Sequence, residues 1–297
     1  MSIPVWTLSR GKTPYAGAML LMAWIAPVVT SVDVGMAAEA PPVPGANVTC
    51  GAPVDHAERH AEMAQRDPLG LFRLAIQQYD RDIRDYRCIF LRQERMNEKL
   101  MPRQTIEVHY RESPRAILMT WLRNPGQAKR ALYQEIVNSD GTGRSQLLVE
   151  PAGAIAKLVA KRVAVPVRGH RSRSAGRYTI DEFGFRAALE RLLLVSDSAL
   201  KRGVLDLTYA GEGEIDGRPT LILVRRLPYS GEGGPYPDAR LLLHLDREWL
   251  LPLAIYSYAD PEGKKLLGSY VMTSVKLNPK LDDAAFMLRQ RPAPGDT

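Results

Sequence analysis

Residues that commonly perform chemistry are scattered through this chain, and their spacing matches few catalytic or metal-binding patterns. His56 and His60 are four positions apart, which on a helix would let both imidazoles bind zinc. Glu58 stands in the wrong position for the His-Glu-x-x-His pattern, so a solvated helix is the preferred interpretation. The sequence has no phosphate-binding glycine motif and no Cys-x-x-Cys pair, and residues 229–233 lack the first glycine of a nucleophile elbow. We therefore expect no catalytic residue, no metal and no cofactor.

A basic segment between residues 151 and 180 contains no acidic residue and is the strongest electrostatic feature of the chain. Such cations suit an anionic headgroup or membrane surface, because a guanidinium binds two phosphate oxygens at once. The headgroup candidates are Arg168, Arg171, Arg173 and Arg177. The alternative is a solvated loop whose charges only maintain solubility, and the sequence favours this simpler interpretation.

The sequence contains two cysteines, Cys50 and Cys88. In an oxidising compartment they could form a disulfide that ties the N-terminal segment to the first strand. Alternatively, Cys88 is a small buried apolar residue in that strand and Cys50 is a free thiol. Both interpretations stay open at this point.

The first 38 residues have the three parts of a secretory signal peptide. Arg10 and Lys12 give a positive start, residues 16–29 are apolar, and small residues allow cleavage near Ala37 or Ala38. The apolar stretch is shorter than the ~20 residues that span a bilayer, and an uncleaved anchor is the alternative. We expect export, most simply to the periplasm of a Gram-negative-type bacterium. Export argues against nucleic acid as a partner, despite a net charge of +7.

Hydrophobic periodicity divides the rest of the chain into a linker, one β-rich domain and a tail. Residues 39–65 are assigned to a flexible linker, 66–290 to a single domain and 291–297 to the tail. A helix should open the domain, because Asp67-Pro68 combines an N-cap with proline at the first helical position. A period of two then predicts antiparallel strands. They are interrupted by a second helix that begins after residues 179–182, which have capping-box spacing.

Some predicted strands are apolar on both faces, which is unusual in a sheet with one solvated side. Ile117, Met119 and Trp121 alternate with Leu118 and Leu122 in one of them. The simpler explanation is a core on one side of the sheet and helices on the other. The more specific explanation is a curved sheet that encloses an apolar cavity.

Several short motifs resemble those of the LolA-like periplasmic lipoprotein carriers. They are Leu245-Asp246, Leu251-Pro252-Leu253, Asn278-Pro279, Asp282-Asp283 and Phe286, in the order in which that superfamily has them. Residues 86–94 are similar to the first strand of such carriers, and residues 178–194 are most similar to an uncharacterised exported family grouped with them. The resemblance implies an α+β fold that is mainly β. A curved antiparallel sheet, an incomplete β-barrel, would be covered by an N-terminal helix and a mid-chain helix.

The same resemblance implies an apolar cavity that binds acyl chains or lipidated proteins without catalysis. The cavity candidates are Phe90, Ile106, Val108, Met119, Trp121 and Leu243. The preferred function is therefore periplasmic binding of a lipid or an acylated protein, with transient contact to an anionic membrane surface. The alternatives are an envelope binding or assembly module without lipid cargo and, third, a hydrolase. The sequence does not indicate an oligomeric state.

Overall fold

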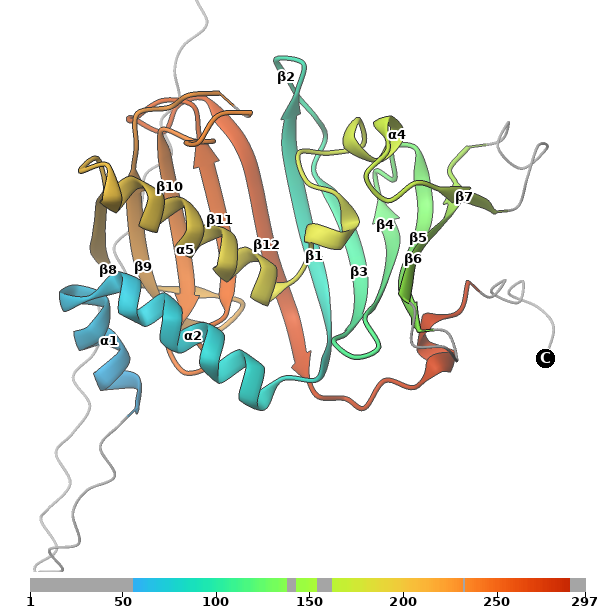
Figure 1. Ribbon diagram of the computed structural model, residues 1–297, viewed down its shortest axis with the longest axis horizontal. Coiled ribbons are helices and arrows are strands. Elements are labelled where there is room, and N and C mark those ends of the chain that lie inside the picture. Colours follow the sequence, from blue (N-terminus) through green and yellow to red (C-terminus); the bar gives the residue numbers. More distant parts are fainter. Residues whose placement is uncertain (1–55, 138–142, 154–161, 232, 289–297) are drawn as a thin grey trace, which may run out of the picture. The chain divides into compact units, whose positions relative to one another are not determined.

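The computed structural model describes residues 56–137, 143–153, 162–231 and 233–288 (Figure 1). All of them belong to one compact unit, Gly51–Thr297. The predicted signal peptide, Cys50 and the tail from residue 291 lie outside the described residues.

The structure moves one predicted boundary, because residues 56–65 do not belong to a linker. They form most of helix α1 (His56–Arg66), which buries His60 and Ala64. His60 Nδ1 lies 2.8 Å from the carbonyl oxygen of Arg247, far along the chain. The expectation of a solvated helix is therefore wrong for this face of α1, because a tertiary contact that local sequence does not reveal holds it.

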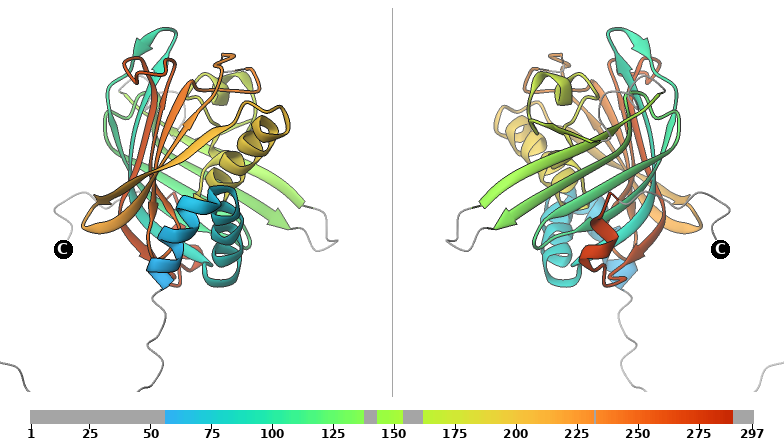
Figure 2. Two further views of the ribbon diagram at one scale, coloured as in Figure 1. Left: turned by 90° about the vertical axis from the view of Figure 1, so that its left-hand side faces the viewer. Right: turned by 90° about the vertical axis from the view of Figure 1, so that its right-hand side faces the viewer.

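One antiparallel sheet contains the strands of the described chain, in the order β7-β6-β5-β4-β3-β1-β12-β11-β10-β9-β8, with β2 paired to β1. The strands are β1 (Asp85–Met96), β2 (Lys99–Leu100), β3 (Gln104–Arg111), β4 (Ala116–Arg123), β5 (Ala128–Val137), β6 (Gly143–Pro151), β7 (Val163–Val165), β8 (Asp206–Ile215), β9 (Arg218–Arg226), β10 (Arg240–Asp246), β11 (Pro252–Tyr258) and β12 (Leu266–Leu277). The sheet curves strongly and stays open, with β7 and β8 at its two ends (Figures 1 and 2). This confirms the predicted curved and incompletely closed sheet.

Two long helices, α2 (Pro68–Asp82) and α5 (Phe185–Lys201), lie over the inner face of β8–β12 (Figure 1). Helix α2 starts as predicted, with an Asp67 carboxylate oxygen 2.8 Å from the amide nitrogen of Gly70. Helix α5 begins after residues 179–182, as predicted. The capping box of Thr179 and Glu182, however, lies at the start of a separate 3-10 helix, η1 (Ile180–Glu182), and α5 follows Gly184.

Gly184 explains why the two helices are separate. Its φ of +128° is a conformation that glycine adopts and that L side chains rarely adopt. A Cβ at this position would also lie 3.0 Å from the ring of Tyr110. The turn at Gly184 thus brings the chain close to β3 before α5 begins.

The apolar core has three main clusters in the described residues. One lies beneath α2 and α5 and contains Phe72, Leu189, Leu223 and Leu243. A second lies over β1 and β3–β5 and contains Tyr86, Ile106, Ile117 and Phe185. The third is on the outer face, where Leu118 and Leu132 pack against Phe286 and Leu288 around helix η2 (Asp283–Phe286).

The outer cluster accounts for the doubly apolar sequence of β4. Ile117 and Met119 belong to the inner cluster, while Leu118 is covered by the C-terminal segment. Both proposed explanations therefore contribute: one face packs against another element, and the other face contributes to a cavity. Leu122, by contrast, is 54% exposed.

Candidate functional site

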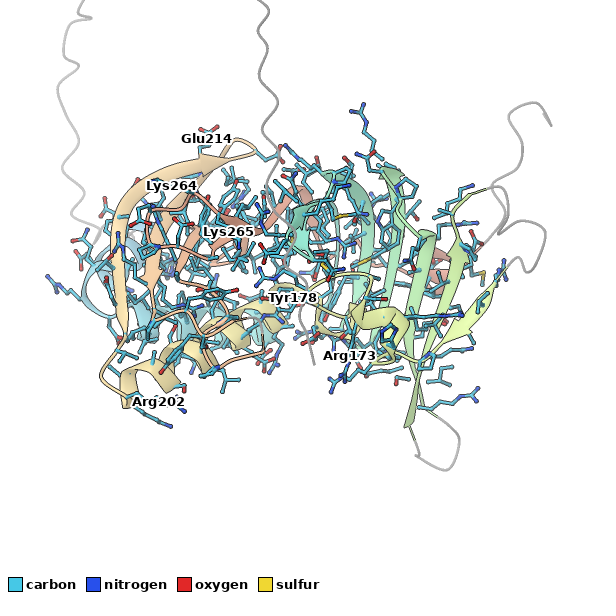
Figure 3. All side chains as sticks on the ribbon, turned by 90° about the horizontal axis from the view of Figure 1, so that it is seen from above. Arg173, Tyr178, Arg202, Glu214, Lys264 and Lys265 are labelled. Carbon is cyan, nitrogen blue, oxygen red and sulfur yellow. The ribbon has the colours of Figure 1, made fainter. Side chains whose placement is uncertain are left out.

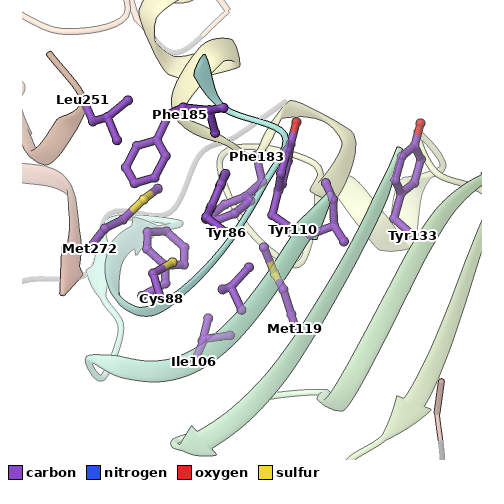
Figure 4. Packing of buried hydrophobic residues seen from close by; sticks show 14 of the residues in the cluster. Tyr86, Cys88, Ile106, Tyr110, Met119, Tyr133, Phe183, Phe185, Leu251 and Met272 are labelled. Carbon is purple, nitrogen blue, oxygen red and sulfur yellow. The ribbon is translucent and has the colours of Figure 1, made fainter. Parts of the chain in front are cut away.

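A cavity of about 990 Å³ lies on the inner face of the sheet, between the strands and the chain segment that crosses them. Its buried wall is apolar and is formed by Phe90, Met119, Ala131, Leu147, Phe183 and Met272. The register explains this wall, because Met119 lies opposite Ala131, and Phe90 lies opposite Met272. Figure 4 shows Met119 rising from its strand on the side where Phe183 lies.

The structure brings three of the six predicted cavity residues to this wall. Phe90, Met119 and Trp121 line the cavity. Ile106 and Val108 point to the same face but are completely buried in the core of β3, between β1 and β4. Leu243 is sealed beneath α2 and α5. The strand pattern gave the correct face, and the covering elements determined which part of that face is hollow.

The lining residues that sequence reasoning missed include Ala131, Leu147, Val149, Phe183 and Met272. Leu147 and Val149 alternate with a period of two on β6, opposite Tyr133 and Ala131 on β5, so this signal was present in the sequence. Phe183 lies at the end of η1, where no periodic pattern of apolar residues could have predicted it.

A cluster of aromatic rings closes one side of the cavity. Tyr86 stacks on Tyr110 at a centroid distance of 4.6 Å and contacts Phe185 at 4.7 Å. Phe183 packs edge-on against Phe90 at 5.1 Å. Burial raises the pKa of the Tyr86 and Tyr110 hydroxyls above the ordinary value, so both rings are neutral. This part of the inner face is filled by side chains.

The segment formed by residues 166–184 covers the cavity and is fixed to β11, β12 and α5. Arg177 donates to the Ser257 hydroxyl at 2.9 Å and to the Pro237 carbonyl at 3.2 Å. The ring of Tyr178 lies 5.8 Å from that of Tyr270, and the Arg191 guanidinium lies 3.9 Å above Tyr178. This cover is therefore built from specific contacts.

The four predicted headgroup arginines have different surroundings. Arg168 forms an ion pair of 2.8 Å with Asp181, which lies just beyond the acid-free stretch. Arg177 donates to Ser257 and so helps to fix the segment that covers the cavity. Arg171 lines the cavity, and Arg173 is exposed on the short helix α4 (His170–Arg173). The guanidinium groups of Arg171 and Arg173 are thus more accessible to a ligand near the cavity than those of Arg168 and Arg177.

Two polar groups interrupt the apolar wall. Arg225 and Asp238 line the cavity as a buried ion pair, with Arg225 Nη2 3.2 Å from both carboxylate oxygens. On the central strands, the Tyr270 hydroxyl donates to Glu94 at 2.9 Å. Burial and the Glu94 charge raise the pKa of Tyr270 well above its ordinary value, which keeps this tyrosine protonated.

Cys88 is a free and buried thiol in the core of β1, which agrees with one of the two interpretations of the sequence. Burial raises the pKa of this thiol above its ordinary value. The proposed partner, Cys50, lies outside the described residues, so the disulfide stays a prediction. In the ranges that the structure covers, no group of three His, Cys, Asp or Glu side chains is placed to hold a metal ion.

The described helices include none that combines the length and apolar character needed to cross a bilayer. The cavity instead has the properties of a small-molecule site, which is typically concave, mostly apolar and supplied with a few polar groups. The arrangement can bury an apolar ligand, and the exposed side chains of Lys99 and Arg171 are part of its lining.

Several solved structures are similar to this chain at low identity. A DUF1329 family protein from Desulfovibrio piger has 11% identity and a TM-score of 0.36, covering 79% of this chain and 98% of its own. MucB in the Pseudomonas aeruginosa MucA/MucB complex has 15% identity and a TM-score of 0.42, covering 74% of this chain and 60% of its own. A LolA superfamily protein from Nitrosomonas europaea has 9% identity and a TM-score of 0.29, covering 72% and 96%. The similar structures thus include the superfamily that the sequence motifs resemble.

No curated protein sequence matches the chain. A family model does match it, over residues 83–292, and its description is a protein of unknown function, DUF1571. These residues include every strand of the sheet and the wall of the cavity. The chain therefore belongs to the DUF1571 family.

Proposed function

We propose that this protein binds a lipid or a lipidated protein by enclosing an acyl chain in the cavity, and that it acts as a non-enzymatic carrier in the periplasm. The observation that carries the proposal is the cavity itself, with its apolar wall of Phe90, Met119 and Met272. Its volume of about 990 Å³ lies within the range of sites for small ligands. The proposed compartment depends on the signal-peptide pattern of residues 1–38.

The driving force would be removal of methylene groups from water. Each buried methylene contributes about 0.8 kcal/mol, so a chain of about 14 methylenes contributes roughly 11 kcal/mol before the costs of association. The ligand head would then lie toward Arg171, which lines the cavity and is exposed. Release would require that the covering segment or a receptor provide another apolar environment for the acyl chain.

A second candidate is an envelope binding or assembly module that has no lipid cargo. The observation that favours it is the aromatic cluster of Tyr86, Tyr110 and Phe185, which fills part of the inner face with side chains. In that case the remaining cavity would be a packing feature, and the functional surface would be elsewhere.

Ligand binding to a cavity-filling variant separates the two candidates. Ala131 is buried in the cavity wall, so Ala131→Trp should fill the space and abolish binding of a fluorescent fatty acid. Ala164→Trp is the matched control, because Ala164 is exposed on β7 between Val163 and Val165, which line the cavity. Lipid extracted from the natively purified protein and detected by mass spectrometry should also disappear in Ala131→Trp. Absence of both probe binding and co-purified lipid in the unchanged protein would contradict the carrier function.

A further inference from the structure

The connection between β1 and β3 forms a tip, Met96–Arg103, that carries exposed apolar side chains at the mouth of the cavity. Leu100 is 37% exposed and Met101 is 40% exposed. Met96, Lys99 and Met101 also line the cavity, so the tip forms part of its rim. In Figure 1 this tip, marked by β2, projects beyond the neighbouring strands.

Cations surround these apolar side chains. Lys99 and Arg103 are exposed on the tip, and Lys264 and Lys265 are exposed on the loop between β11 and β12. Glu98, the acid of the tip, pairs with Lys265 at 2.7 Å, and this contact lowers the pKa of the Glu98 carboxyl. The charges of Glu98 and Lys265 therefore offset each other, and the loop also carries Asp260 and Glu262. The excess of positive charge at this end comes from Lys99 and Arg103 together with helix α4.

The antiparallel register explains why these groups meet. The end of β1 lies beside the start of β12, because Glu94 is opposite Gly268. Helix α4 adds Arg171 and Arg173 to the same end of the sheet (Figure 1). Figure 3 looks onto this end and labels Arg173, Lys264 and Lys265.

The opposite end of the sheet carries charges of both signs. Glu112, Glu214, Asp216, Glu248 and Asp283 lie at its turns and strand ends, together with Arg111, Arg218, Arg247, Lys276 and Lys280. What distinguishes the tip is that cations and exposed apolar side chains lie together at the mouth of the cavity.

We infer that the tip Met96–Arg103 is a docking site for an anionic lipid bilayer. Leu100 and Met101 enter the boundary between headgroups and acyl chains, while Lys99, Arg103 and the neighbouring cations contact phosphate groups. Charge complementarity selects this partner, since a basic surface with exposed apolar side chains matches an anionic leaflet. Docking at the tip would place the cavity mouth against the membrane. The docking surface does not depend on cargo, so it can be tested separately from the proposed function.

The test is flotation of the purified protein, expressed from its full sequence, with vesicles of phosphatidylcholine that contain about one-third phosphatidylglycerol. Lys99→Ser with Arg103→Ser should reduce binding roughly 25-fold, since each cation near an anionic surface contributes about fivefold. Leu100→Ser with Met101→Ser should reduce it about tenfold, because the apolar contribution is lost. Leu100 and Arg103 are the tip residues of these variants that do not line the cavity, so the single variants Leu100→Ser and Arg103→Ser should bind vesicles less well and still bind a fluorescent fatty acid as the unchanged protein does. Ala131→Trp should lose the fatty acid and still bind vesicles.

Matched controls change exposed residues away from the tip. Lys276→Ser with Lys280→Ser removes two cations at the opposite end of β12, and Leu194→Ser removes a leucine that is 72% exposed on α5. Both should bind vesicles normally. The inference is overturned if the unchanged protein does not bind the anionic vesicles, if the tip variants bind as well as it does, or if the controls lose binding equally. It is also overturned if the tip binds a protein partner and does not bind lipid.

Discussion

The two halves of the inner face are built from similar apolar strands but are covered differently. Over β8–β11, helices α2 and α5 seal side chains such as Leu223 and Leu243 into a core, and the cavity reaches this half at Arg225, Leu241 and Ile255. Over β4–β6, the cover is the irregular segment 166–184, and Met119, Trp121 and Leu147 are left facing a cavity. A long amphipathic helix fills a concave surface closely, whereas a short irregular segment bridges it. The cavity therefore results from the kind of cover, with the same kind of strand beneath both.

The largest predicted effect concerns the ion pair that fixes α5 over the helix-covered half. Arg225 contacts Asp238 at 3.2 Å and the Ser196 hydroxyl of α5 at 3.2 Å, and both charged side chains are less than 5% exposed. Asp238→Asn leaves the Arg225 charge buried without compensation and should lower the free energy of unfolding by about 3–5 kcal/mol in chemical denaturation. The control is Asp206→Asn, which breaks the exposed Arg226–Asp206 pair and should cost about 0–1 kcal/mol. Equal and small losses in both variants would mean that the buried pair does not fix α5.

A second prediction compares equivalent truncations in the two halves. Leu243→Ala opens a new void beneath the helices and should cost about 2–5 kcal/mol of unfolding free energy. Met119→Ala enlarges an existing cavity, loses fewer packing contacts and should cost only about 1–2 kcal/mol. Urea titration of both variants measures the difference. If Met119→Ala is as destabilising as Leu243→Ala, the space beside Met119 is packed and the contrast between the halves is wrong.

The smallest prediction concerns the outer face of the helix-covered half. His244 Nδ1 lies 3.0 Å from the Thr220 hydroxyl, and burial lowers the pKa of this imidazole below 6.5. As the pH falls below 6.5, the unfolded chain takes up this proton before the folded protein does, so this contribution to stability is lost. His244→Gln can keep a hydrogen bond to Thr220 and should make the urea midpoint less dependent on pH between 7.5 and 5. A variant with the unchanged pH dependence would show that other groups control acid sensitivity.

The sequence predicted the strands because their period of two depends only on which face of the sheet each residue occupies. It predicted the start of α2 because an N-cap acts within three residues, from Asp67 to Gly70. It predicted that α5 begins after residues 179–182, but it did not predict that their capping box belongs to a separate 3-10 helix. The turn at Gly184 that separates the two helices packs against the ring of Tyr110, which is distant in the chain. Local signals were therefore reliable wherever local contacts decide the structure.

By itself, the sequence determined the antiparallel strands, the apolar inner face and the basic segment 151–180, which overlaps the cavity cover, while the resemblance implied the curvature of the sheet. The tertiary structure alone decided that Met119 and Trp121 line a cavity while Ile106, Val108 and Leu243 are sealed, and that His60 docks on Arg247. The physical reason is that periodicity determines the face on which a side chain lies. What covers that face comes from segments far away in the sequence, and their packing leaves more space in one half than in the other.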